Sequence, residues 1–424
     1  MTTLGLGPLC AECISIVKEI PPMLLFGLLF SCLLGLLSLA YILLLIIAPA
    51  PRAPFPEEKQ YKAILEDGSV AKEQQLPCWR DKINLDTYKR SDLEEPTLFM
   101  SVVIPAYNEE KRLPGMLEEA VNYLERTYGT SQLSSQAEKV KASALQSLEN
   151  EDQNGTRLRQ KVNGKTGSLT DKHANSPLTG WEILIVSDGS TDKTVETALG
   201  FAKDHQLSVH PKGHAGPWTP KSKEGVKIPA GSIRVIELTQ NRGKGGAVTH
   251  GMRHVRGQYA IFADADGASN FNDLGKLVEA CQKIEDSDHR VVAVGSRAHL
   301  VGSDVVVKRS KLRNFLMHSF HLALRLLTPP ATARINDTQC GFKLFSRASL
   351  PYIIPYMHSE GWIFDVEMLM LAEFANIPVA EVPIGWKEVS GSKLSVVWDS
   401  LGMAYGLAIL RAAWGFGVYT RAGA

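Results

Sequence analysis

The chain has 424 residues, of which 46 are lysine or arginine and 45 are aspartate or glutamate, so its formal net charge is only +1. A charge so close to zero provides no bulk attraction to nucleic acid, and an anionic partner must be bound by local basic clusters. The 6 cysteines are scattered and do not form the dense framework of a small disulfide-stabilised protein. We therefore expect no nucleic-acid partner and a main domain in a reducing compartment.

The first predicted element is a membrane-spanning helix at residues 23–48. No charged residue lies within 20–51, and the apolar run exceeds the roughly 20 residues that a helix needs to cross a bilayer. A cleavable signal peptide is the alternative, but its apolar region is usually about 7 to 15 residues long. We therefore expect an uncleaved anchor that follows an N-terminal tail at residues 1–22.

The charges on the two sides of this helix predict its orientation. Arg52, Lys59 and Lys62 follow the helix, whereas mainly Lys18 precedes it. Positive residues favour the cytosolic side of a membrane, so we expect the large C-terminal part in the cytosol. Residues 49–97 mix proline, lysine and glutamate with little periodicity and are interpreted as a linker.

The next part of the chain alternates between strand-like and helix-like patterns. Apolar, β-branched runs predict strands, and apolar residues at helical spacing predict helices. The expected strands are 99–104, 182–186, 233–238, 259–263 and 291–295, and the expected helices are 109–126, 191–203 and 245–255. This alternation predicts an α/β domain over residues 98–398, with a mostly parallel sheet and helices on both faces.

Three segments fall outside that alternation. Residues 130–177 are polar and poor in large apolar side chains, so they are interpreted as an insertion. Proline, glycine, lysine and histidine crowd residues 207–231, which predicts a second, shorter insertion. Residues 399–424 contain an apolar run that Arg411 interrupts, and this pattern predicts an interfacial helix.

Polar motifs follow four of the predicted strands. In a parallel α/β sheet, ligands bind beyond the carboxyl ends of the strands, so these positions are the candidate site. Each motif alone could form an ordinary turn, and the evidence is that they occur together. They are PAYNE at 105–109, SDGS at 187–190, NRGKGG at 241–246 and DADG at 264–267.

The last two motifs contain groups suited to a diphosphate. Asp264 and Asp266 are spaced so that both carboxylates can reach one Mg²⁺ or Mn²⁺ ion, although a solvated acidic turn is the alternative. Lys244 lies in a glycine-rich segment at the predicted start of a helix, where backbone N–H groups suit an anion. The segment lacks P-loop spacing, and no G-x-G-x-x-G follows the first strand, which argues against a P-loop NTPase or a dinucleotide-dependent dehydrogenase.

These residues resemble the GT-A glycosyltransferases of family 2, and within it the dolichyl-phosphate β-glucosyltransferases of the endoplasmic reticulum. The strings that carry the resemblance are SVVIPAYNEE, IVSDGSTDKT, NRGKGGAV, FADADGA, GSRAHL, DTQCGFKLF and FDVEML. The resemblance implies a GT-A fold in which Asp264 and Asp266 hold the metal and Lys244 lies near the diphosphate. It also implies a nucleotide pocket formed by Pro105, Tyr107, Glu109 and Asp188. Ser187 stands where the family usually has another acidic residue.

A basic cluster follows the fifth predicted strand. The resemblance implies that Arg297 and Arg309 hold a lipid phosphate with Arg313 beside them, whereas an exposed basic face is the alternative. Residues 308–325 suit a helix in the membrane interface, or an amphipathic helix packed on the core. Four residues in strings shared with the family are expected to shape the acceptor and sugar pocket: Asp337, Lys343, Trp362 and Asp365.

The reaction implied by the resemblance is transfer of glucose from UDP-glucose to dolichyl phosphate with inversion at the anomeric carbon. The product, dolichyl β-D-glucosyl phosphate, would be a donor for N-glycan assembly. A phosphomonoester has a second pKa of about 6, so the acceptor is ionised at neutral pH and needs no catalytic base. We expect a single-pass protein of the endoplasmic reticulum membrane whose catalytic domain faces the cytosol. Two alternatives remain, a dolichyl-phosphate mannosyltransferase that uses GDP-mannose and an inactive membrane scaffold.

Overall fold

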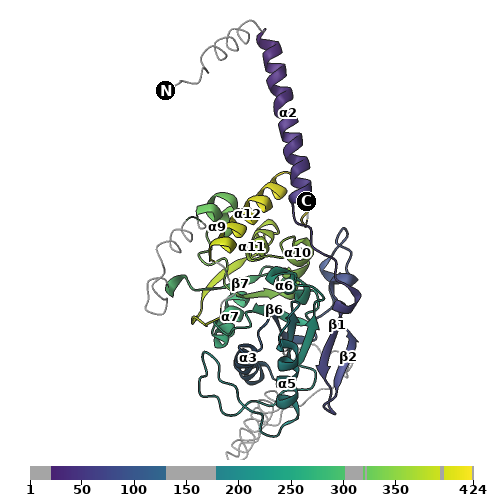
Figure 1. The fold of residues 1–424 in the computed structure, drawn as a ribbon, viewed down its shortest axis with the longest axis vertical. Coiled ribbons are helices and arrows are strands. Elements are labelled where there is room, and N and C mark those ends of the chain that lie inside the picture. The colour runs from purple at the N-terminus through teal and green to yellow at the C-terminus, as the bar shows by residue number, and fades with distance from the viewer. Residues whose placement is uncertain (1–20, 130–177, 301–318, 320–321, 392–395, 423–424) are drawn as a thin grey trace, which may run out of the picture.

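The computed structural model describes residues 21–129, 178–300, 319, 322–391 and 396–422. Its first element is α2 (Pro22–Ile47), a 26-residue apolar helix that projects from the rest of the molecule (Figure 1). Pro22 begins the helix, a position where proline costs no hydrogen bond, and Ala48 ends it in an extended conformation. In the described part of the chain, α2 is the one helix that is long and apolar enough to cross a membrane.

Within the described residues, the centre of the molecule is a nine-stranded sheet with the order β2-β1-β5-β4-β3-β6-β8-β7-β9. Strands β5, β4, β3 and β6 form its parallel centre, as predicted, and β8 lies antiparallel between β6 and β7. The strands are β1 (Gln60–Ile64), β2 (Val70–Gln75), β3 (Leu98–Ala106), β4 (Trp181–Ser187), β5 (Ile233–Glu237), β6 (Gly257–Ala263), β7 (Val292–Ser296), β8 (Phe342–Ser346) and β9 (Val379–Pro383).

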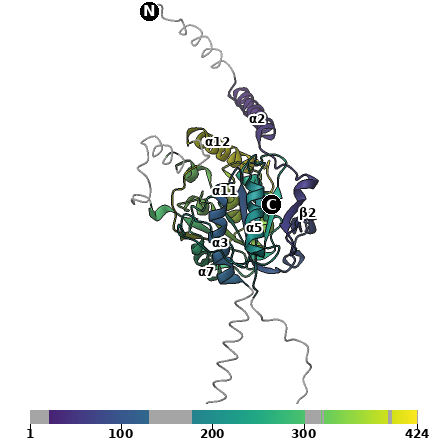
Figure 2. The same ribbon diagram turned by 60° about the horizontal axis from the view of Figure 1, so that its bottom comes forward.

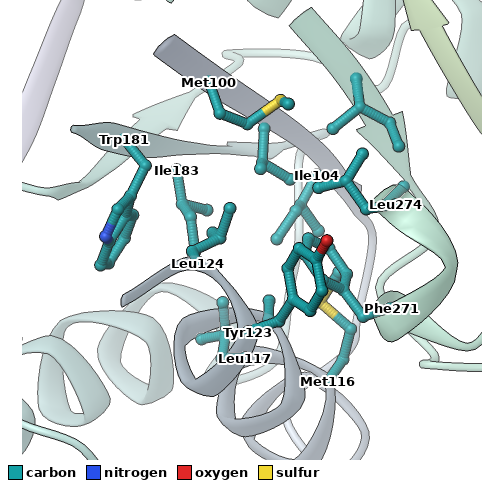
Figure 3. Close-up of a cluster of buried hydrophobic side chains, with 14 of the residues drawn as sticks. Met100, Ile104, Met116, Leu117, Tyr123, Leu124, Trp181, Ile183, Phe271 and Leu274 are labelled. Carbon is teal, nitrogen blue, oxygen red and sulfur yellow. The ribbon is translucent and has the colours of Figure 1, made fainter. Parts of the chain in front are cut away.

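Helices cover both faces of this sheet. Successive residues of its central strands point to opposite sides, so both faces carry apolar side chains that the helices bury. Met100, Val102 and Ile104 of β3 pack with α3, α5 and α7, whereas Val103 packs with α6 and α11. Figure 3 shows the first of these clusters, with side chains of the sheet and α3 in contact. The helices are α3 (Leu113–Tyr128), α5 (Thr194–Leu207), α6 (Lys244–Met252), α7 (Leu274–Ile284), α9 (Pro330–Ala333), α10 (Leu350–Ile353), α11 (Phe364–Phe374) and α12 (Val396–Gly415). The predicted α/β class is confirmed.

A third apolar cluster joins the base of α2 to the domain. Leu44 packs with Met370 of α11 and with Leu407 and Leu410 of α12. Tyr419 Oη, beyond α12, donates to Pro49 O at 2.7 Å. In both ribbon views α2 leaves the domain on the side that carries α12 (Figures 1 and 2).

The segment interpreted as a linker, residues 49–97, is instead part of the folded domain. It contains β1 and β2, and β1 pairs antiparallel with β5 at the edge of the sheet. Trp79 and Leu93 from the same segment are buried in the cluster around α6. The linker interpretation was wrong because short edge strands with mixed charged residues carry almost no periodicity, and their pairing partner lies far along the chain.

The second predicted insertion forms an ordered cover over α3. Residues 208–232 contain no helix or strand, and a single bridge joins Lys212 to Glu224 in this described stretch. The buried Glu119 of α3 accepts from Trp218 N at 2.6 Å and from Thr219 N at 3.0 Å. The first predicted insertion, 130–177, lies outside the described residues.

Candidate active site

The polar motifs after β3, β4 and β5 meet at one edge of the sheet. Parallel strands present their carboxyl ends to the same edge, so distant segments of the chain come together there. Asp188 N donates to Ala106 O at 2.8 Å, and Asn241 Nδ2 donates to Asp188 O at 3.0 Å. These bonds connect the three loops into one surface.

Asp188 shapes the glycine-rich loop at 241–246. Its Oδ1 accepts from Arg242 N at 2.7 Å, and its Oδ2 accepts from Gly243 N at 2.9 Å. Gly243 has a φ of 83°, a conformation that favours glycine, and it immediately precedes α6. Burial raises the pKa of Asp188 to about 6 in spite of these two bonds. Both carboxylate oxygens of Asp188 are therefore used to hold the loop.

Lys244, the first residue of α6, approaches the carboxylate that follows β6. Its Nζ lies 2.6 Å from Asp264 Oδ1 and 5.8 Å from the centre of the Trp362 ring. Burial acts to lower the pKa of Lys244, but the neighbouring Asp264 and Asp365 carboxylates prevail and raise it. A charged amine at the N-terminus of a helix is suited to an anionic group.

Asp264 and Asp266 fit a divalent cation whose remaining ligands come from the substrate. Asp264 Oδ1 is buried and makes an ion pair but no well-directed hydrogen bond within the described part of the chain. Burial, together with the adjacent Asp264 carboxylate, raises the pKa of Asp266. No group of three or more His, Cys, Asp or Glu among the described residues could hold a metal alone. Two carboxylates with substrate phosphates and water match the usual environment of Mg²⁺.

Gly341 makes room for Asp264. A Cβ atom at Gly341 would overlap the Asp264 carboxylate, and Asp264 N donates to Gly341 O at 3.1 Å. The glycine in the string DTQCGFKLF thus allows the strand that follows it to lie against the acidic loop after β6. Sequence reasoning had given Gly341 no role.

The other expected nucleotide-binding residues lie around the end of β3. Pro105 is within β3, and the Tyr107 side chain that follows is 40% exposed. Glu109 is buried, and its Oε2 accepts from Arg112 Nε at 2.6 Å. Arg112 Nη1 also lies 3.8 Å from Asp266 Oδ2, so Arg112 connects the first motif to the fourth.

Arg297 is oriented by Asp337. Arg297 Nε donates to Asp337 Oδ2 at 2.7 Å, and Nη2 donates to Asp337 Oδ1 at 2.8 Å. Burial acts to lower the pKa of Arg297, but this two-point pairing prevails and raises it. The guanidinium also lies 5.7 Å from the centre of the Trp386 ring. Asp337 therefore fixes the direction of Arg297.

Lys343 and Asp365 form a buried ion pair behind the site. Lys343 is fully buried in β8, and its Nζ also donates to Cys340 O at 2.7 Å. Burial raises the pKa of Asp365, while Lys343 and Lys244 oppose that change. Lys343 can therefore act on the site through Asp365, whereas the Trp362 side chain is 36% exposed at the surface. Arg309 and Arg313 lie outside the described residues.

Known proteins are similar in sequence to this chain over most of its length. A family model described as glycosyl transferase family 2 matches residues 223–351, which include the glycine-rich loop, both aspartates and Arg297. The dolichyl-phosphate beta-glucosyltransferase of Saccharomyces cerevisiae is 37% identical over 396 residues, covering 92% of this chain and 94% of that protein. The chain belongs to the dolichyl-phosphate beta-glucosyltransferase family.

Other members of this family give similar values. The Drosophila melanogaster protein is 38% identical, with 73% of each chain covered. The Homo sapiens protein is 34% identical and covers 75% of this chain, with 76% of its own length matched. Among solved structures, a glucosyl-3-phosphoglycerate synthase from Mycobacterium tuberculosis in complex with uridine diphosphate is 17% identical with a TM-score of 0.41, covering 75% of this chain and 80% of that chain. That likeness is too low to bear on the site.

Sequence reasoning missed several residues that organise this candidate site. Arg112 could have been found, because it lies one helical turn after Glu109. Glu58 and Glu360 carried no such signal, since both contact the glycine-rich loop region across long separations in the chain: Arg242 Nη2 donates to Glu58 Oε2 at 2.6 Å, and Gly246 N donates to Glu360 O at 3.1 Å.

Proposed function

We propose that the protein transfers glucose from UDP-glucose to dolichyl phosphate, giving dolichyl β-D-glucosyl phosphate and UDP with inversion at the anomeric carbon. The observation that carries this proposal is the meeting of Lys244 with Asp264 at the ends of α6 and β6, beside Asp266. Membership of the dolichyl-phosphate beta-glucosyltransferase family supports the choice of sugar and acceptor. The product would supply glucose for N-glycan assembly.

The donor is proposed to lie across the loops after β3 to β6. The nucleotide would occupy the surface near Pro105, Tyr107 and Glu109, with Asp188 holding the adjacent glycine-rich loop in shape. The diphosphate would lie at the N-terminus of α6, next to Lys244. A positive amine placed there stabilises the negative charge that grows on UDP as its bond to glucose breaks.

Asp264 and Asp266 are the proposed ligands of a divalent ion, either Mg²⁺ or Mn²⁺. Such an ion, when bound, neutralises charge on the departing diphosphate. The two carboxylates lie close enough for Asp264 to contribute to the raised pKa of Asp266, and a cation would relieve their repulsion. Arg112, near Asp266, would limit how far the second carboxylate can turn away.

In this proposal, the nucleophile is a phosphate oxygen of the acceptor. A phosphate oxygen forms a bond to the anomeric carbon while the bond from that carbon to the UDP oxygen breaks, so no proton has to be removed. Arg297, held in direction by Asp337, would position the phosphate, with Arg309 and Arg313 beside it. The buried pair Lys343 and Asp365 would support Lys244, and Trp362 would line the sugar pocket.

The lipid acceptor requires the site to lie near a bilayer. We propose that α2 is a single span in the endoplasmic reticulum membrane, with the domain on its cytosolic side. Arg52 contacts the glycine-rich loop region, and only four residues separate Arg52 from Ile47 at the end of α2, so this connection can extend at most about 18 Å. Exposed Trp398, Leu401 and Tyr405 on α12 support an interfacial role for that helix beside the base of α2.

The contacts described above support our proposal for the domain boundaries. We propose a tail at 1–22, an anchor at 23–48 and an interfacial helix within 399–424, which α12 (Val396–Gly415) supports. The catalytic domain would begin near Pro56 rather than at residue 98, since β1 and β2 extend its sheet.

The first experiment is transfer of radiolabelled sugar to dolichyl phosphate by the full-length protein in detergent. UDP-glucose and GDP-mannose would be compared, with and without divalent metal, and Asp266→Ala would be the control. We expect metal-dependent transfer from UDP-glucose that is lost in Asp266→Ala. Transfer from GDP-mannose alone would replace the proposed donor, and no transfer from either donor by a folded protein would overturn the proposed function.

A further inference from the structure

The chain that leaves α2 is bound to the glycine-rich loop by Arg242. Arg242 Nη1 donates to Arg52 O at 2.6 Å, and Nη2 donates to Ala53 O at 2.9 Å. The same guanidinium pairs with Glu58 Oε2 at 2.6 Å, and both side chains are buried. A loop residue two positions before Lys244 therefore holds three residues of the segment that follows α2.

Arg52 also contacts Glu360 and the glycine-rich loop through its own side chain and backbone N–H. Its Nε donates to Glu360 Oε2 at 2.6 Å, and its backbone N donates to Glu360 Oε1 at 3.3 Å. Arg52 Nη2 also donates to Asn241 O, the first residue of the glycine-rich loop, at 3.4 Å. We name this set of contacts the anchor junction; its residues are Arg52, Ala53, Glu58, Asn241, Arg242 and Glu360.

The backbone of Glu360 also contacts the glycine-rich loop. Its backbone O accepts from Gly246 N at 3.1 Å. The same oxygen would lie only 2.6 Å from a Cβ atom at Gly243, so the two backbones are in close contact. Glu360 thus touches the loop on both sides of Lys244, and a shift of Glu360 must move the start of α6.

We propose that the anchor junction is part of the donor site, with Arg52 and Glu360 as positioning residues that act through the glycine-rich loop. This inference rests on the proposed function, because it takes that loop to bind the diphosphate of UDP-glucose. The position of the segment that follows α2 then determines how tightly the loop binds the donor. The acceptor phosphate is bound by other residues, so the junction affects affinity for the donor and not for dolichyl phosphate.

Arg52 is the residue to change, because its loss leaves the buried part of the junction intact. The Arg52 and Glu360 side chains are 45% and 20% exposed, whereas Arg242 and Glu58 are buried. Removing one partner of a buried pair can unfold a protein, but removing an exposed partner rarely does. Lys82 offers a matched control, since its ion pair with Glu94 also measures 2.6 Å and is exposed, with no contact to the glycine-rich loop among its described bonds.

The experiment measures KM for each substrate and kcat in full-length Arg52→Ala, Glu360→Gln and Lys82→Ala proteins, together with the affinity for UDP by calorimetry. We expect Arg52→Ala and Glu360→Gln to raise KM for UDP-glucose and Kd for UDP by roughly twofold to fivefold. KM for dolichyl phosphate should be unchanged in both, and Lys82→Ala should behave as wild type. The exchange variant Arg52→Glu with Glu360→Arg should recover part of the affinity for UDP.

Two results would overturn the inference. One is a wild-type Kd for UDP in Arg52→Ala and Glu360→Gln, and the other is an equal rise of KM for both substrates. The calorimetric measurement also separates this inference from the proposed function. If the wild-type protein binds UDP but transfers no glucose, the proposed function fails, while the effect of Arg52→Ala on UDP affinity still decides the role of the junction.

Discussion

Lys244 Nζ lies 2.6 Å from Asp264 Oδ1, so the amine at the start of α6 and the first carboxylate after β6 form an ion pair. The two residues come from different motifs of the chain. They meet because β3 lies between β4 and β6 in the sheet, and Asp188 after β4 holds the loop at the start of α6 close to the end of β6. In the proposed reaction, a donor diphosphate would be held between this amine and a metal bound to the carboxylates.

Lys244→Met should lower kcat for glucose transfer by roughly 100-fold to 1,000-fold, the usual effect of removing one preorganised group that stabilises developing charge. Methionine retains the length and apolar contacts of the side chain, so the fold should persist. The measurement is steady-state kinetics with UDP-glucose. Lys276→Met is the control, because Lys276 is exposed and pairs only with Asp273 among its described contacts. A loss below tenfold would contradict the assigned role.

Gly341→Ala should reduce activity and stability together, because the added methyl group would overlap the Asp264 carboxylate. Overpacking at such a site costs about 1–3 kcal/mol of unfolding free energy, and the displaced carboxylate would weaken metal-dependent activity. Thermal unfolding and the metal concentration for half-maximal activity check both effects. Gly200→Ala, with open space at its Cβ position in α5, should leave the metal dependence unchanged and raise stability by about 0.5–1 kcal/mol, because alanine favours a helix more than glycine does. Unaltered metal dependence in Gly341→Ala would refute this account.

Lys343→Met should destabilise the protein by about 3–5 kcal/mol, because Asp365 would remain buried without its partner. The double variant Lys343→Met with Asp365→Leu removes both charges and should regain most of that stability. Activity should not return, since Asp365 also helps to keep Lys244 charged. Chemical denaturation and the glucose-transfer assay test these two statements. Full activity in the double variant would show that the buried pair has only a structural role.

Asp188 should make stability depend on pH. Its pKa is raised by burial from 3.8 to about 6, so the folded state binds this proton more tightly than the unfolded chain. The resulting stabilisation is present below about pH 4 and is lost as pH rises through about pH 6, a change on the order of 3 kcal/mol. Thermal unfolding of wild type and Asp188→Asn between pH 4 and pH 7 measures it. The wild type should lose stability relative to the variant as pH rises, and parallel curves would contradict the prediction.

Local patterns were sufficient to predict much of the fold. The apolar run at 23–48 is α2 (Pro22–Ile47), and the run at 99–104 lies within β3 (Leu98–Ala106). Such elements can be found because a bilayer requires an apolar run of about 20 residues, and because a strand buried on both faces is itself a short run of apolar residues. The positions of Asp264 and Lys244 followed from the same logic, since polar residues at the ends of buried strands collect at one edge of a parallel sheet.

The sequence by itself therefore determined the membrane-length helix, the central strands and the four polar motifs at their ends. Only the tertiary structure decided that residues 49–97 extend the sheet, that Asp188 holds the glycine-rich loop, and that Arg52 reaches Glu360. These features depend on single contacts between residues far apart in the chain, and such contacts produce no periodic pattern in the sequence. A hydrogen bond of this kind leaves no pattern in either partner's neighbourhood, because it is made only after the sheet has brought the two segments together.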